Sequence, residues 1–101
     1  MANTVIVRWQ GFESGDEATA MYDAVHPTMM KMIGSGDYPG LTFHSCSKTD
    51  DGIVIVDVWE DAATWQAAFG SAEAQAAFQQ AGIPEPTSVE IYPTHNVEQA
   101  S

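Results

Sequence analysis

The chain has 101 residues, with three basic residues against fourteen acids and a formal net charge of −11. This length suits one domain covering residues 1–101, and an apolar content of 45% argues against disorder. Because so acidic a surface repels phosphate groups, we expect no nucleic-acid binding and no attachment to anionic membranes. The charge is either an adaptation to salt or a means of keeping a small protein in solution, and we favour the second interpretation.

No stretch of the sequence approaches the roughly 20 apolar residues that would cross a bilayer. The first residues run into a predicted strand without the basic region and apolar core of a signal peptide. Cys46 is the single cysteine, which excludes an internal disulfide and suits a reducing compartment. These features predict a cytoplasmic location.

The N-terminal part of the chain predicts a strand followed by a helix. Residues 4–9 are almost continuously apolar, as in a strand covered on both faces. Ser14 and Glu17 match a capping box that starts a helix, and a segment rich in Gly and Pro ends it. Pro27 lies inside this helix, so we expect a kink or a break near residues 24–26. The buried face of the helix repeats at helical spacing and comprises Ala18, Met21, Tyr22, Val25, Met29, Met32 and Ile33.

Two strands are predicted in the middle of the chain, one at residues 41–47 and one within the stretch 52–61, and a turn rich in Asp and Gly joins them. Alternation along the first of them predicts Leu41 and Phe43 on one face and His44 on the other. The second is almost entirely Ile and Val until it reaches a Trp, so it is apolar on both faces. Both faces of the sheet must therefore be covered.

The C-terminal part predicts a helical region and a last strand. Asp61 is the expected N-cap of the helical region, and Gly82 is suited to end it. Gly70 and Ser71 in its middle indicate either two short helices or one bent helix. Residues 88–92 form the last predicted strand.

The resulting order, β-α-β-β-α-β, predicts an α+β fold of the ferredoxin-like type. In that fold an antiparallel four-stranded sheet carries its helices on one face. The opposite face would be bare, although the first and third strands are apolar on both faces. A second copy of the chain, packed sheet to sheet by a two-fold axis, would cover it, and we expect a homodimer.

The order of elements and the run Val-Asp-Val-Trp-Glu-Asp at residues 56–61 resemble the dimeric α+β barrel superfamily, in particular small antibiotic-biosynthesis-monooxygenase-like proteins. In that family an aromatic residue follows a few positions into the helix, as Trp65 or Phe69 does here. Residues 89–96 also resemble the end of small actinobacterial members. The resemblance implies a dimeric barrel. It leaves the activity open among cofactor-free oxygenases, haem-degrading and haem-dependent enzymes, cyclases, isomerases and proteins without known activity.

The haem-degrading branch can be compared residue by residue. Its members resemble this chain around Trp65, with an aromatic residue where Phe69 stands and an axial His nine residues later. Phe78 occupies that position here, and a phenyl ring cannot ligate iron. Haem degradation of this type is therefore disfavoured, with His26 on the other helix as a weak substitute ligand.

Three histidines could carry chemistry. His44 and Cys46 lie two residues apart on one strand face, as a metal-ligand or acid–base pair would, although ordinary packing of both is the alternative. His26 follows Tyr22 by four residues and directly precedes the helix proline, which suits a general acid or base over the sheet. His95 follows the last strand. For His26 a surface position is the alternative, and for His95 a hydrogen bond at the end of a loop.

Asp57 is the polar exception in the third strand and Arg8 the exception in the first. They could form a structural ion pair across neighbouring strands, or Asp57 could act as a buried base. Aromatic side chains at strand and helix spacings could hold a substrate, although plain core packing is the alternative. They are Trp9, Tyr22, Phe43, Trp59, Trp65, Phe69 and Tyr92.

Three functions fit these residues. The first is a small enzyme, such as a cofactor-independent monooxygenase, cyclase or isomerase, that acts on a hydrophobic aromatic or polyketide-like molecule. His44, with His26 or His95 and Asp57, would then move protons. The second is a non-catalytic binding or structural dimer, and the third is a His-ligated metal or haem protein. No phosphate-binding, dinucleotide or serine-hydrolase motif is present, so no cofactor is predicted. No Cys-x-x-Cys or His-x-x-x-His motif accompanies His44 and Cys46, so no metal site is predicted either.

Overall fold

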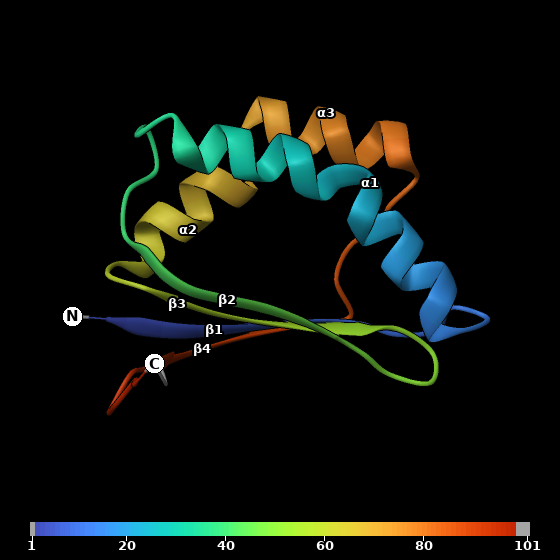
Figure 1. The fold of residues 1–101 in the computed structure, drawn as a ribbon, viewed down its shortest axis with the longest axis horizontal. Helices are drawn as coiled ribbons and strands as arrows, with labels where there is room; N and C mark the ends of the chain where they lie inside the picture. The colour runs from blue at the N-terminus through green and yellow to red at the C-terminus, as the bar shows by residue number, and fades with distance from the viewer. Residues whose placement is uncertain (1, 99–101) are drawn as a thin grey trace.

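The computed structural model describes residues 2–98 and consists of a four-stranded antiparallel sheet with three helices on one face (Figure 1). The strand order is β2-β3-β1-β4. This arrangement confirms the predicted α+β fold. Among the described residues, no helix is long and apolar enough to cross a membrane. In chain order the elements are β1 (Asn3–Trp9), α1 (Gly15–Gly34), β2 (Leu41–Lys48), β3 (Ile53–Trp59), α2 (Ala62–Phe69), α3 (Ala72–Ala81) and β4 (Ser88–Pro93).

Local capping explains where the helices begin and end. The Ser14 side chain accepts from the Glu17 backbone N–H at the start of α1. The predicted helical region is two helices, because the Ser71 hydroxyl caps α3 by accepting from Ala74 N–H. Gly82 ends α3 with a φ of 71°, a left-handed conformation that glycine adopts without strain.

Pro27 bends α1 without breaking it. The helix runs continuously from Gly15 to Gly34 and changes direction about halfway along its length (Figure 1). A proline removes one backbone hydrogen bond and presses against the preceding turn, which accounts for the bend. The expected kink is therefore present and the alternative, a break, is not.

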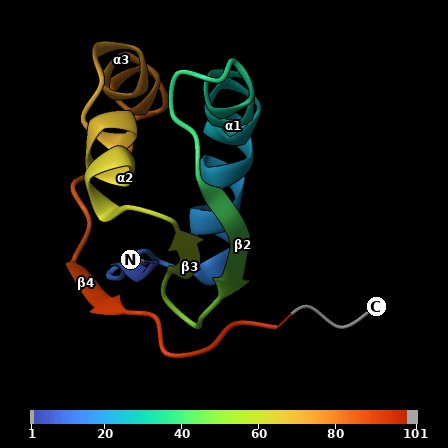
Figure 2. The same ribbon diagram turned by 90° about the vertical axis from the view of Figure 1, so that its left-hand side faces the viewer.

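The main core lies between the sheet and the helices. Val5, Val7 and Trp9 alternate inward along β1 and pack against Trp59 of β3 and Trp65 of α2. The first strand thus has one covered face and one open face in a single chain. Figure 2 shows α1 and the α2–α3 pair side by side above the sheet.

A β-bulge changes the predicted pattern of β2. The register shifts between Leu41 and Phe43, so Leu41 lies with His44 on the helix side, while Phe43 pairs with Val58. The prediction that Leu41 and Phe43 share one face is wrong. An extra residue in one strand reverses the alternation locally, and no residue type in this stretch signals it.

The face of the sheet opposite the helices carries Ile6, Val54 and Val56, all half-buried. None of the three helices covers it (Figures 1 and 2). Arg8 and Glu90 form an ion pair of 3.3 Å on the same face. This face is therefore an apolar stripe beside a charged pair.

Candidate active site

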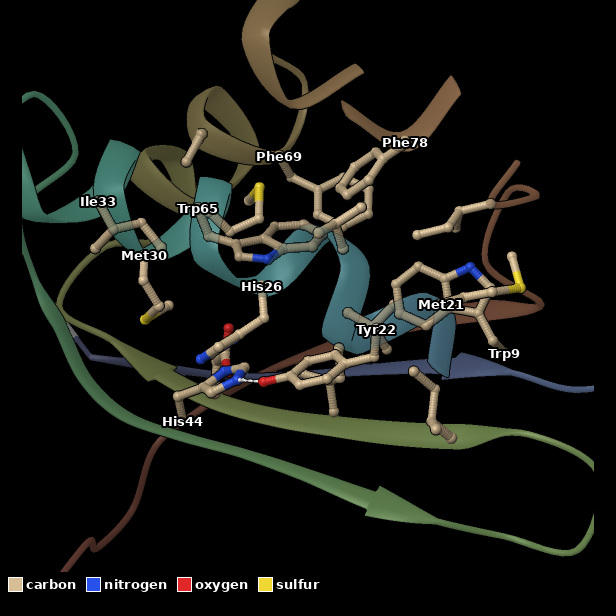
Figure 3. Close-up of a pocket in the computed structure, with 18 of the residues that line it drawn as sticks. Trp9, Met21, Tyr22, His26, Met30, Ile33, His44, Trp65, Phe69 and Phe78 are labelled. Carbon is tan, nitrogen blue, oxygen red and sulfur yellow. Dashed lines mark hydrogen bonds and ion pairs between the residues drawn. The ribbon is translucent and has the colours of Figure 1, made fainter. Parts of the chain in front are cut away.

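A cavity with an open mouth lies between the sheet and the three helices (Figure 3). Its lining is apolar except for Tyr22, His26, His44 and Asp57, which gather at one end. A concave cavity with apolar walls and a few convergent polar groups is typical of small-molecule sites. Five aromatic residues predicted to hold a substrate line it, namely Trp9, Tyr22, Trp59, Trp65 and Phe69.

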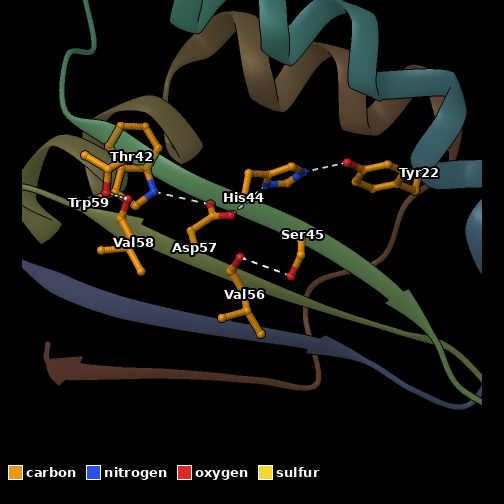
Figure 4. A network of polar contacts seen from close by, with 8 residues as sticks. All are labelled: Tyr22, Thr42, His44, Ser45, Val56, Asp57, Val58 and Trp59. Carbon is orange, nitrogen blue, oxygen red and sulfur yellow. Dashed lines mark hydrogen bonds and ion pairs between the residues drawn. The ribbon is translucent and has the colours of Figure 1, made fainter. Parts of the chain in front are cut away.

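Three polar side chains form a hydrogen-bonded chain at this end of the cavity (Figure 4). Tyr22 Oη lies 2.5 Å from His44 Nε2, and His44 Nδ1 lies 2.6 Å from Asp57 Oδ1. Asp57 Oδ2 accepts from Trp59 Nε1 at 3.2 Å. Both oxygens of the Asp57 carboxylate and both nitrogens of the His44 imidazole therefore take part in hydrogen bonds.

The sheet register brings these groups together. His44 of β2 pairs with Asp57 of β3, and both side chains point to the helix side. Asp57 is only 7% exposed, and a polar group buried to this extent is costly unless it has hydrogen-bond partners. The predicted alternative, an ion pair between Asp57 and Arg8, is wrong. Arg8 lies opposite Val54 and pairs with Glu90 on the other face of the sheet.

The hydrogen bonds assign the protons of this chain. A carboxylate at Asp57 accepts, so His44 carries its proton on Nδ1 and offers the Nε2 lone pair to the cavity side. Burial, together with the nearby Cys46 and Asp57, raises the pKa of Tyr22 to about 12, so Tyr22 donates its hydroxyl proton to Nε2. This arrangement positions an unprotonated imidazole nitrogen to receive a proton through the tyrosine hydroxyl.

His26 completes the polar end of the cavity. Its ring stacks on Tyr22 with centroids 5.0 Å apart and on His44 with centroids 5.8 Å apart. His26 directly precedes Pro27 in α1, and Figure 3 shows its side chain above the sheet beside His44. Two of the three histidines predicted as candidates therefore converge.

The other predicted residues lie elsewhere. His95 is exposed beyond β4, and Tyr92 is 50% exposed and hydrogen-bonded to Glu90. Phe43 pairs with Val58 and is absent from the cavity wall. Figure 2 shows the segment after β4 passing below the sheet, on the side away from the helices. The structure thus separates His95, Phe43 and Tyr92 from the cavity.

Cys46 shares its strand face with His44 but not its hydrogen bonds. Burial, and secondarily Asp23, raises the pKa of the thiol to about 11, so it remains protonated at neutral pH. Thiol ligands bind metals as thiolates. Within residues 2–98 no group of three or more His, Cys, Asp or Glu side chains is placed to hold a metal ion.

Three methionines in the cavity wall were not predicted as site residues. Met21 and Met29 belong to the apolar stripe of α1 and were assigned to packing, and Met30 lay outside that stripe. Their common feature, a flexible thioether on the helix that carries His26, was visible in the sequence. Methionine adapts to irregular ligands, so the wall opposite the sheet is deformable.

Comparisons with known proteins identify the fold. No protein-family model and no curated protein matches the sequence. SnoaB from Streptomyces nogalater, a cofactor-independent oxygenase, superposes with a TM-score of 0.68 at 14% identity over 95% of both chains. A protein from Chloroflexus aurantiacus named as an antibiotic biosynthesis monooxygenase gives 0.66 at 13% identity over 98% of both chains.

A third similar structure contains a bound ligand. It is a monooxygenase from the gene ActVA-Orf6 of Streptomyces coelicolor in complex with nanaomycin D, with a TM-score of 0.62 at 14% identity over 99% of this chain and 92% of that one. At such identities the similarity concerns the fold. It confirms the resemblance noted in the sequence: this chain has the ferredoxin-like fold that the antibiotic-biosynthesis-monooxygenase structures share.

Proposed function

We propose that the protein is a cofactor-independent monooxygenase that oxidises a hydrophobic aromatic substrate after removing a proton from it. The observation that carries the proposal is the Tyr22–His44–Asp57 chain, which opens into a cavity whose walls are apolar apart from these groups and His26. The description of SnoaB as a cofactor-independent oxygenase supports the same class of reaction.

In the proposed mechanism His44 is the base, Tyr22 passes the proton and Asp57 holds the imidazole. A substrate C–H or O–H group lies against Tyr22 Oη, which accepts its proton while donating its own to His44 Nε2. Asp57 stabilises the imidazolium that results and fixes the ring through Nδ1. The substrate is left as an electron-rich carbanion or its enolate.

Oxygen then reacts with this anion without a cofactor. One electron passes from the anion to O₂, and the resulting substrate radical and superoxide combine to form a C–O bond and a peroxide anion. His44 returns its proton through Tyr22 to the peroxide, which becomes a hydroperoxide. His44 then takes the second proton of the same carbon through Tyr22 as the O–O bond breaks, and the departing hydroxide receives this proton to leave as water, so that a ketone remains. A CH₂ group plus O₂ thus gives a C=O group plus H₂O.

The walls of the cavity support this chemistry. Trp9, Trp65 and Phe69 offer flat faces against which an aromatic ring can stack. Apolar walls also exclude water, which strengthens the electrostatic effect of Asp57 on His44.

We further propose that the protein acts as a homodimer through the face that carries Ile6, Val54 and Val56. These side chains are apolar, and none of the three helices covers them. Size-exclusion chromatography with light scattering should give twice the chain mass of 10.9 kDa at micromolar concentration. Val56→Glu should give the monomer mass, whereas Gln79→Glu on the exposed side of α3 should not change the dimer. A monomeric wild type contradicts this part of the proposal.

The activity is tested with 1,8-dihydroxyanthrone, a tricyclic substrate with an acidic CH₂ group. Oxygen uptake and formation of the anthraquinone should exceed the rate in buffer, with one ¹⁸O atom entering the product from ¹⁸O₂. Isomerisation or cyclisation of a substrate without oxygen uptake would assign a different reaction to the same base. Binding without any turnover would favour the non-catalytic alternative.

A further inference from the structure

The cavity has no fixed positive charge. The sequence contains three basic residues, and none of them is in the cavity wall. Arg8 pairs with Glu90 on the opposite face of the sheet, and Lys48 pairs with Asp16 at the surface, where its side chain is 56% exposed. Lys31 is exposed on α1.

The polar end of the cavity is negative instead. Asp57 is buried there, and Asp23, which is exposed and outside the cavity wall, is still close enough to contribute to raising the pKa values of Tyr22 and Cys46. A protonated His44 already has Asp57 as its counter-ion at 2.6 Å. A second carboxylate at this imidazole would lie close to the first and be repelled by it.

We propose that the cavity selects neutral hydroxyaromatic or ketoaromatic ligands whose polar groups lie along one edge, and that it rejects the same ring systems when they carry a carboxylate. The inference rests on the proposed function, because it assigns the substrate class of the same cavity. Its physical basis is desolvation. The polar edge of a neutral ligand meets Tyr22 and His44, whereas an ionised carboxylate that lies against the Met, Phe and Trp side chains of the wall would be buried without a partner.

A matched series of ligands separates charge from size. The neutral member is 1,8-dihydroxy-3-(hydroxymethyl)anthraquinone, the anionic member is the corresponding 3-carboxylic acid, and the methyl ester of that acid is larger but neutral. All three tryptophans of the chain line the cavity, so quenching of intrinsic fluorescence reports on binding, and isothermal titration calorimetry checks it. Both are measured at pH 7 on the full chain.

The alcohol and the ester should bind with dissociation constants within about fivefold of each other, and the acid should bind about 100-fold more weakly, as expected for an unpaired buried charge. Equal or tighter binding of the acid overturns the inference. Acid binding that is lost in His26→Gln would overturn it too, by assigning a carboxylate site to His26. Failure of all three ligands to bind also counts against it.

A charge added to the wall should reverse the selection. Met21 lies toward the end of the cavity away from His44 (Figure 3). Met21→Lys should recover most of the lost affinity for the acid, whereas Met21→Gln, which is polar but neutral, should not. Equal acid affinity in the two variants contradicts the inference. The outcome is independent of turnover, since selective binding without oxygen uptake would refute the oxygenase and leave the ligand class standing.

Discussion

His44 and Asp57 occupy paired positions on the neighbouring antiparallel strands β2 and β3, and their Nδ1 and Oδ1 atoms are 2.6 Å apart. Cross-strand partners on one face are the closest side chains that a sheet offers. The pair is therefore fixed by two rigid elements rather than by a loop. The other ring nitrogen of His44, Nε2, faces the Tyr22 hydroxyl at the polar end of the cavity.

Asp57→Asn tests whether Asp57 positions the His44 imidazole for catalysis rather than helping to bind the substrate. His44 Nδ1 and Trp59 Nε1 donate to different oxygens of Asp57, and Asn replaces one of these oxygens with an NH₂ group that cannot accept. One buried donor therefore loses its partner, at a cost of about 1–3 kcal/mol in unfolding free energy. We expect kcat to fall about 100-fold with KM nearly unchanged. Nitrogen-15 NMR of the histidines should show His44 losing its preference for the Nδ1–H form. An unchanged tautomer with reduced kcat would contradict the positioning role.

Tyr22→Phe tests whether the proton passes through the hydroxyl. The substitution keeps the ring that stacks on His26 and removes only the group 2.5 Å from His44 Nε2. We expect kcat to fall about 10- to 100-fold, less than the loss from removing the base itself. A rate equal to or above that of the wild type would mean that the substrate meets Nε2 directly and that the hydroxyl merely occupies its place.

The raised pKa of Cys46 predicts a thiol that is alkylated slowly at neutral pH and that loses its proton only at high pH. Burial raises the pKa from 9.0 to about 11, so the rate of alkylation by iodoacetamide should rise with an inflection near pH 11 in the folded protein and near 9 in urea. The folded state holds this proton more tightly than the unfolded state. The free energy of unfolding should therefore decrease as pH rises from about 9 toward 11, and less so in Cys46→Ala. A folded-state inflection at or below 9 contradicts the assignment.

Gly52→Ala should destabilise the fold. A Cβ at this position would collide with the backbone carbonyl of Trp9, and backbone cannot move aside as a flexible side chain can. We expect a loss of about 1–3 kcal/mol in unfolding free energy, measured by urea denaturation. Gly34→Ala is the matched control, because open space surrounds its Cβ and its φ is not positive, so it should be neutral or slightly stabilising. Equal effects of the two substitutions would contradict the steric argument.

Much of the fold follows from patterns in the sequence. Continuous apolar runs predict strands covered on both faces, of which the helices cover one in the single chain. Ser14, Asp61 and Gly82 mark helix ends by hydrogen bonds that involve only a few neighbouring residues. The bulge at Leu41 was not predictable in this way. It depends on how two distant strands align, and no local residue preference encodes it.

Several residues of the candidate site could be predicted from the sequence, but the hydrogen bonds that join them could not. His26 and His44 were singled out, and α1 and β2 bring them together. Asp57 was expected as a buried base or as the partner of Arg8. Its actual partner depends on the register between β2 and β3, because a shift of one residue would send a side chain to the other face of the sheet. His95 was included among the candidates only because it is a histidine. The residue type does not show where the segment after the last strand lies relative to the cavity.

The most direct test of the central claim is the rate of oxygen-dependent turnover of 1,8-dihydroxyanthrone in His44→Ala, compared with the wild type and with Ser45→Ala. Ser45 is the next residue of β2, and its hydroxyl bonds to the Val56 carbonyl outside the cavity, so its loss controls for strand disruption. If His44 is the base, His44→Ala should lose about 10²- to 10⁴-fold in kcat while Ser45→Ala stays within about threefold of the wild type. A folded His44→Ala protein that turns over at the wild-type rate would contradict the assignment of His44 as the base.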